Sequence, residues 1–254
     1  MYTRLVNNLD ELGFTEVEPF LSEHLNAAAK NGTSVQESLL DITNREISLR
    51  NQRAAQIQVS VSHFPYLKTI DEYDFHFQTT VNKAEIKDFV TLRFLENKEN
   101  ILFYGTPGTG KTHLATAIGI EAAKKRNLTY FITCHDLIQT LRKAYDENRL
   151  ESRLKHFSKY KLLIIDEIGY LPVDKTGANL LFQLIAKRYE HNSTIITTNQ
   201  PFSKWGEVFS DSMLANAILD RLLHHSHVVK MVGPSYRTKD YYDLLDSGEQ
   251  NSNH

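Results

Sequence analysis

The chain has 254 residues, a formal charge of −2 and an apolar fraction of 41%. This length suits one α/β domain with a small appendage, and the composition predicts a packed core. A single cysteine, Cys134, excludes an intramolecular disulfide, and we find neither a signal peptide nor an apolar run of about 18 residues. We therefore expect a cytoplasmic protein that does not enter the membrane.

Residues 1–62 are predicted to form a small, all-helical N-terminal domain. Leu21 and Leu25 recur at helical spacing, and a second helix is predicted over residues 35–58, which are rich in good helix formers. A short polar and glycine-containing stretch separates the two helices and ends in Ser34, which is a suitable N-cap.

An aromatic and irregular segment, residues 63–80, follows these helices, and we interpret it as a linker that packs onto the next domain. In residues 81–240, short apolar or β-branched runs alternate with helix-like stretches. This alternation predicts a three-layer α/β domain with a parallel sheet covered on both faces. The polar residues 241–254 are expected to be disordered. The predicted strands are residues 101–104, 128–132, 162–165, 194–198 and 227–231.

One segment after the first predicted strand matches the phosphate-binding pattern G-x-x-x-x-G-K-[ST] in full. Glycines in this pattern let backbone N–H groups approach phosphate oxygens, and a helix N-terminus follows. Lys111 suits the β- and γ-phosphates, and the Thr112 hydroxyl suits Mg²⁺. The next residue, His113, is included among the nucleotide-binding candidates. The motif consists of Gly105, Thr106, Pro107, Gly108, Thr109, Gly110, Lys111 and Thr112.

Two acidic residues end the third predicted strand, at the sheet edge where ligands bind in such folds. Asp166 is suited to hold Mg²⁺, and Glu167 is suited to polarise the attacking water. Asn199 ends the fourth strand at the same edge, where an amide can sense the γ-phosphate or orient water. The alternative for Asn199 is an ordinary strand-end turn before Pro201.

Two features near the fifth strand leave alternatives open. Arg221 lies in an otherwise apolar helix, so it is either paired with Asp220 or its neighbours, or offered to a partner subunit. In the second case it would neutralise charge on the transferred phosphoryl group. His224, His225 and His227 suggest a metal site, but no second ligand cluster with supporting spacing is found, so a structural role is favoured.

The charge is distributed unevenly along the chain. Residues 142–161 carry seven Lys/Arg and three Asp/Glu, so this stretch is basic. Residues 1–80 carry six Lys/Arg and eleven Asp/Glu, so the N-terminal part is acidic. A basic helical face would bind DNA phosphates without reading the base sequence, and the alternative is a solvated amphipathic helix. The DNA-binding candidates are Arg142, Lys143, Arg149, Arg153, Lys155 and Lys159.

Several strings, in a fixed order, resemble one known family over nearly the whole chain. The chain closely resembles the IstB-like transposition helper ATPases and, more distantly, the DnaC-type helicase loaders. Both belong to the initiator-like branch of the AAA+ proteins. The strings that carry this resemblance are residues 91–95, 105–114, 164–172, 188–190, 198–202 with Trp205, 219–225 and 233–237.

This resemblance implies an ATPase that uses ATP and Mg²⁺, forms homo-oligomers with ATP at the subunit interfaces and serves a partner transposase in DNA recombination. It also implies that the basic insertion binds double-stranded DNA. Asn199 looks like sensor 1, Arg221 like an arginine finger and Arg237 like sensor 2. Too little chain follows the fifth strand for the helical lid that carries sensor 2 in most AAA+ proteins, which puts the role of Arg237 in doubt. The alternative functions are a helicase loader and a nucleotide-gated scaffold with little turnover.

Overall fold

The computed structural model describes residues 1–239, so the predicted disordered tail lies outside the described residues. The chain divides into two compact units between Ile57 and Gln58. The first unit contains three helices, of which the third runs into the second unit. These helices are α1 (Tyr2–Glu11), α2 (Glu18–Asn31) and α3 (Val35–Ser60).

Local signals in the sequence explain the helix boundaries of the first unit. Gly32 ends α2 in the left-handed region, with a φ of 68°. Ser34 begins α3 as predicted: its Oγ accepts from the Glu37 N–H at 3.2 Å, and the Glu37 carboxylate accepts from the Ser34 N–H at 3.0 Å. The helices enclose a small apolar core of Val17, Phe20, Leu21 and Ile42.

The second unit contains all five predicted strands. Strand β3 continues three residues beyond its predicted end, because Ile168 pairs with Thr198 of the neighbouring strand. The elements are α4 (Lys83–Thr91), α5 (Arg93–Glu96), β1 (Asn100–Gly105), α6 (Lys111–Lys124), β2 (Thr129–Thr133), α7 (Cys134–Asp146), α8 (Leu150–Ser158), β3 (Leu162–Ile168), α9 (Lys175–Arg188), β4 (Ser193–Thr198), η1 (Phe202–Lys204), α10 (Trp205–Val208), α11 (Ser212–Leu223), β5 (Ser226–Met231) and η2 (Tyr236–Thr238).

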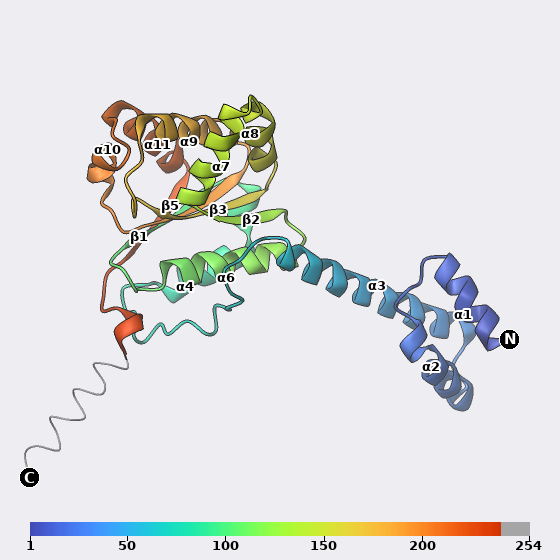
Figure 1. The fold of residues 1–254 in the computed structure, drawn as a ribbon. Coiled ribbons are helices and arrows are strands. Elements are labelled where there is room, and N and C mark those ends of the chain that lie inside the picture. The colour runs from blue at the N-terminus through green and yellow to red at the C-terminus, as the bar shows by residue number, and fades with distance from the viewer. Residues whose placement is uncertain (240–254) are drawn as a thin grey trace, which may run out of the picture. The chain divides into compact units, whose positions relative to one another are not determined.

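The sheet is parallel, with the strand order β2-β3-β4-β1-β5. Helices α4 and α6 cover one face, and α7 to α11 cover the other (Figure 1). Successive side chains along β1 alternate between two cores: Ile101 and Phe103 pack with α6, whereas Leu102 packs under α9. Cys134 is buried in the second of these cores, and burial raises the pKa of its thiol to about 12. The predicted three-layer α/β arrangement is confirmed.

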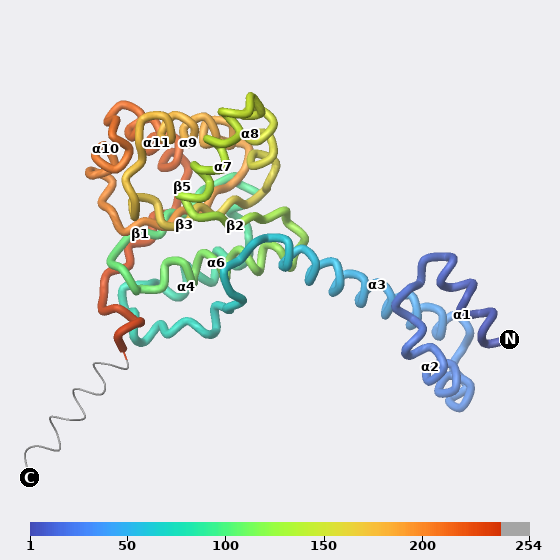
Figure 2. Tube along the Cα trace, in the orientation of Figure 1, coloured from blue at the N-terminus to red at the C-terminus, as the bar shows by residue number. Residues whose placement is uncertain are grey.

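The strand order brings distant segments of the chain together. Strands β3, β4 and β1 are neighbours, so their carboxyl ends meet at one edge of the sheet, as the chain trace shows (Figure 2). The glycine-rich loop follows β1, the acidic pair lies in β3, and Asn199 follows β4. This edge therefore holds the candidate site.

After β5, the described part of the chain contains only the short 3₁₀ helix η2. The absence of a helical lid remains a prediction, because residues 240–254 are not described. Among the helices within residues 1–239, none has both the length and the apolar character that a membrane span requires.

Candidate nucleotide-binding site

The loop between β1 and α6 requires glycine at specific positions. Gly108 has a φ of 78°, and a Cβ there would lie 1.9 Å from the Ser235 Oγ. Gly110 has a φ of 88° and begins α6, and a Cβ at this position would lie 2.5 Å from the Tyr73 ring. No side chain of residues 1–239 caps the start of α6. Its first N–H groups are therefore available to bind an anion.

Lys111 reaches back into this loop. Its Nζ donates to the carbonyl oxygens of Gly105 at 2.9 Å and Thr106 at 2.7 Å. Burial lowers the pKa of Lys111 to about 8, although the Asp166 carboxylate opposes the shift. The ammonium group thus lies in the loop, where phosphate charge would favour its protonated form.

A hydroxyl and a carboxylate lie together beside Lys111. The Thr112 Oγ1 donates to the Asp166 Oδ1 and Oδ2, at 3.0 and 3.2 Å. Asp166 is 4% exposed, and burial raises the pKa of its carboxyl group. A buried carboxylate next to a hydroxyl is the oxygen-donor set that Mg²⁺ prefers, so these two residues fit the predicted ion.

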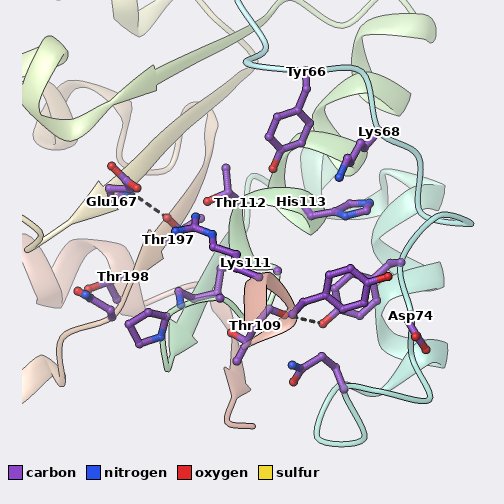
Figure 3. Close-up of a pocket in the computed structure, with 18 of the residues that line it drawn as sticks. Tyr66, Lys68, Asp74, Thr109, Lys111, Thr112, His113, Glu167, Thr197 and Thr198 are labelled. Carbon is purple, nitrogen blue, oxygen red and sulfur yellow. Dashed lines mark hydrogen bonds between the residues drawn. The ribbon is translucent and has the colours of Figure 1, made fainter. Parts of the chain in front are cut away.

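Thr197, which was not among the residues predicted from the sequence, links the two acidic residues. Its Oγ1 donates to the Asp166 Oδ1 at 2.5 Å and accepts from the Glu167 N–H at 2.9 Å. Glu167 has a positive φ of 61°, which this contact helps to hold. The Glu167 side chain faces the pocket, above Thr197 (Figure 3).

A pocket of about 390 Å³ lies between these groups. Gly105 and Thr106 do not line this pocket, but their carbonyl oxygens accept hydrogen bonds from Lys111. Asp166 does not line it either; it accepts hydrogen bonds from Thr112 and Thr197, which do. The predicted residues that line the pocket are Pro107, Gly108, Thr109, Gly110, Lys111, Thr112, His113, Glu167, Asn199 and Arg237.

Part of the pocket wall comes from the aromatic segment, residues 63–80, that we interpreted as a linker. The Tyr73 hydroxyl donates to the Thr109 carbonyl at 2.9 Å, and the His113 Nε2 lies 2.7 Å from the Thr69 carbonyl. Sequence reasoning missed this role, and the only available signal was the concentration of aromatic residues directly before the domain. The pocket-lining residues of this segment are Tyr66, Lys68, Glu72, Tyr73, Asp74 and Gln78.

Arg237 reaches the pocket because the chain after β5 is bonded to the glycine-rich loop. The Tyr236 N–H donates to the Gly108 carbonyl at 2.9 Å, and the Thr106 Oγ1 donates to the Gly233 carbonyl at 3.1 Å. The Arg237 charge contributes to the lowered pKa of Lys111. Arg237 therefore lines the same pocket as Lys111.

Arg221 lies outside this pocket. Its Nη1 donates to the Ala217 carbonyl at 3.0 Å, and its guanidinium lies 4.7 Å from the Phe182 ring centroid. Within residues 1–239 Arg221 forms no ion pair with Asp220 or with any other acidic residue. The alternative that it is paired within its own chain is therefore not observed.

The three histidines near β5 do not form one cluster. His227 pairs with Glu99 at 3.1 Å. His224 and His225 instead lie 3.9 Å from a Glu190 carboxylate oxygen, and the side chains of Glu190, His224 and His225 are exposed. The three-histidine metal site is therefore not formed.

The six DNA-binding candidates do not all lie at one place on the surface. Lys143, Arg149 and Arg153 line a surface hollow of about 320 Å³ between α7 and α8, together with His156. Burial, and then the nearby cations, lower the pKa of His156. Arg142 instead pairs with Asp174. Lys155 and Lys159 are exposed and lie outside the hollow, and Arg149 also pairs with Glu147.

Comparisons with known proteins identify the family of this chain. The model of a family described as IstB-like ATP binding protein matches residues 7–243. A protein named for ATP binding in insertion sequence IS232 of Bacillus thuringiensis subsp. berliner is 56% identical, over 95% of this chain and 96% of its own. The corresponding IS5376 protein of Geobacillus stearothermophilus is 46% identical, over 87% and 90%.

Solved structures of two other proteins share the fold. The DnaC helicase loader has a TM-score of 0.51 and 28% identity, over 58% of this chain and 86% of that one. AMPPCP-bound DnaA from Aquifex aeolicus has a TM-score of 0.56, over 73% and 56%, but its 18% identity shows the fold alone.

Proposed function

The chain belongs to the family of IstB-like ATP-binding proteins, and on that premise we propose that it is an AAA+ ATPase that assembles on DNA and assists a transposase. The observation that carries the ATPase proposal is the convergence of Lys111, the Thr112–Asp166 pair and Glu167 on one pocket. These groups come from two separate segments, the start of α6 and strand β3, and match the separate needs of phosphoryl transfer.

Binding of the triphosphate uses the glycine-rich loop. Its backbone N–H groups and the start of α6 face phosphate oxygens, and the Lys111 ammonium neutralises their charge. Thr112 and Asp166 would hold Mg²⁺, which supplies charge neutralisation at the phosphates. The Asp166 carboxylate must be ionised for this role.

Hydrolysis then depends on the position of Glu167. Its carboxylate accepts a hydrogen bond from the attacking water and polarises it. Thr197 keeps the Glu167 backbone in place, and the Asn199 amide at the end of β4 orients the water or the terminal phosphate. Arg237 contacts the phosphates within the same subunit, which suits a sensor 2 role without a lid.

Arg221 acts on the neighbouring subunit's ATP in this proposal. It lies outside its own pocket and forms no ion pair within residues 1–239, where its guanidinium contacts the Ala217 carbonyl and the Phe182 ring. Mixing Lys111→Ala with Arg221→Ala tests this directly. Each variant alone should be inactive, and the mixture should recover activity because a mixed interface joins one intact pocket to one intact arginine.

DNA binding is assigned to the hollow between α7 and α8. Three cations line it, and α8 begins there without a side-chain cap, so phosphate would meet both positive side chains and unpaired N–H groups. Lys143→Ala/Arg153→Ala should weaken binding to random-sequence duplex DNA uniformly and reduce its salt dependence. Arg142→Ala is the matched control, because its guanidinium is already paired with Asp174.

The transposase is the favoured partner because relatives covering nearly the whole chain are named for insertion sequences. The likeness to the DnaC helicase loader supports a second candidate, a loader of a replicative helicase. Co-purification with the transposase of the same insertion sequence, compared with the host helicase, separates the two. In either case we expect the protein to act in the cytoplasm.

The first experiment measures particle size with ATP and Mg²⁺, with and without random-sequence duplex DNA. We expect large, salt-sensitive assemblies that need both ligands, disappear with Lys111→Ala and persist with Glu167→Gln. Unaltered ATP turnover in Glu167→Gln would exclude Glu167 as the water-polarising group. Assembly that ignores DNA would instead favour a loader or scaffold acting through protein contacts.

A further inference from the structure

Three side chains of metal-binding types converge away from the nucleotide pocket. The Glu190 Oε1 lies 3.9 Å from the His224 Nδ1 and 3.9 Å from the His225 Nε2. The two imidazole rings lie side by side, with their centroids 4.0 Å apart. One ligand atom from each of the three residues lies within 4.8 Å of the other two. Two ring nitrogens and a carboxylate oxygen are therefore directed to one place on the surface.

Asn100 joins the two segments that carry these side chains. Glu190 precedes β4, and both histidines precede β5. The Asn100 Oδ1 accepts from the Thr194 N–H at 2.9 Å, at the start of β4. Its Nδ2 donates to the Leu222 carbonyl at 3.1 Å, and its N–H donates to the His225 carbonyl at 2.8 Å. The backbone on both sides of the cluster is thus held in place, while the exposed side chains can still adjust.

The cluster lies at the edge of the sheet opposite the nucleotide pocket. The strands are parallel, and Glu190 and His225 come just before β4 and β5, whereas the glycine-rich loop follows β1. None of the three side chains lines the pocket. A metal ion bound by them would therefore be separate from the Mg²⁺ proposed at Thr112 and Asp166.

We propose that Glu190, His224 and His225 form a zinc-binding site that ties the turn between α9 and β4 to the end of α11. Two imidazoles and one carboxylate are a known ligand set of zinc, with water at the fourth position, whereas Mg²⁺ prefers oxygen ligands. Ligand atoms around a tetrahedral zinc lie about 3.3 Å apart, so these atoms must approach by about 0.6 to 1.5 Å. All three side chains are about half exposed, so rotation about their side-chain bonds allows this movement.

The Tyr189 hydroxyl competes for one of these ligands. It lies 2.6 Å from the His224 Nδ1, the nitrogen that is near Glu190. Zinc at this nitrogen must displace the hydroxyl, which can then turn to water because the contact is exposed. Tyr189→Phe removes the competitor, so this variant should bind zinc more tightly than the wild type.

His227 supplies a matched control. It lies only two residues after His225, but its Nε2 pairs with Glu99 at 3.1 Å. It does not belong to the group of converging ligand atoms. His227→Ala therefore removes an imidazole from the same segment without removing a proposed ligand.

The experiment titrates Zn²⁺ into the metal-free, full-length protein by calorimetry, without a histidine tag or nucleotide and in an excess of Mg²⁺. We expect the wild type and His227→Ala to bind one zinc ion per chain with the same affinity. His224→Ala, His225→Ala and Glu190→Gln should each weaken zinc binding at least about tenfold, because each removes a direct ligand. Zinc should also raise the unfolding temperature of the wild type, but not of these three variants, because the site exists only in the folded chain.

Three outcomes would overturn the proposal. If the wild type binds no zinc, the histidines only accompany Glu190 on the surface, and this result does not depend on the folding of any variant. If His227→Ala loses as much affinity as His225→Ala, the ion is held elsewhere. Weaker zinc binding by Tyr189→Phe would exclude the His224 Nδ1 as a ligand. None of these results depends on whether the protein binds ATP.

Discussion

Removing the Thr197 hydroxyl should uncouple ATP hydrolysis from ATP binding. This hydroxyl is the only described group that contacts both acidic residues: it donates to Asp166 at 2.5 Å and accepts from the Glu167 N–H at 2.9 Å. Thr197→Val keeps the shape of the side chain, which is 1% exposed, and deletes only these two bonds. The Asp166–Thr112 contact and the contacts of Lys111 remain.

The expected magnitudes follow from those two bonds. A buried group left without its hydrogen-bond partner costs about 1–3 kcal/mol, so loss of both bonds should lower the free energy of unfolding by roughly 2–6 kcal/mol. Loss of the Glu167 anchor should slow hydrolysis by about 10–100-fold, which corresponds to about 1.4–2.8 kcal/mol of barrier. The ATP dissociation constant should change by less than about threefold, because Thr197 does not touch the glycine-rich loop.

The assay combines urea unfolding, ATP binding and single-turnover hydrolysis. Thr194→Val is the control, since Thr194 is also 1% exposed on β4, but its hydroxyl accepts from the Arg188 Nε at 3.1 Å, away from the site. The control should lose stability and keep its hydrolysis rate. A wild-type rate in Thr197→Val, or an equal slowing in the control, would refute the reasoning.

The pH profile gives a second readout of the same change. Burial raises the pKa of Asp166, while the hydrogen bond from Thr197 lowers it. Asp166 must be ionised to hold Mg²⁺, so activity is lost as pH falls through its pKa. Because Thr197→Val removes a bond that favours the ionised form, the acidic limb should move to higher pH. An unshifted limb would show that Asp166 does not control it.

Three further predictions concern binding and stability. ATP affinity should fall by up to about tenfold per pH unit above pH 8, because burial lowers the pKa of Lys111 to about 8 and only the charged ammonium attracts phosphate. An affinity that stays constant between pH 8 and 9.5 would contradict this. Arg188→Lys should lower the free energy of unfolding by about 3 kcal/mol or more, measured in urea, because one ammonium group cannot replace a buried guanidinium with four acceptors. A loss near zero would refute that role. Gly108→Ala should abolish ATP binding in calorimetry without unfolding the protein, because its φ is 78° and a Cβ would lie 1.9 Å from the Ser235 Oγ; wild-type affinity would refute the loop geometry.

Local patterns in the chain were enough to predict the elements and the phosphate loop. β-Branched and apolar runs predicted all five strands, because burial on both faces of a parallel sheet demands them. The spacing of Gly105, Gly110 and Lys111 predicted the loop, since the backbone conformation it needs is set by neighbouring residues. The predicted α/β P-loop fold of AAA+ type is confirmed, and the family is the one that the motif strings indicated.

Contacts between distant residues could not be derived in the same way. The strand order, the bond from Thr197 to Asp166 across 31 positions and the bond from Gln78 to Pro234 across 156 positions all arise only when the sheet assembles. Hydrophobic periodicity shows which face of a strand is buried, but it does not show which strand lies beside it. For that reason the residues proposed to bind phosphate were visible in the sequence, whereas Thr197, which hydrogen-bonds both Asp166 and the Glu167 N–H, became visible only in the tertiary structure.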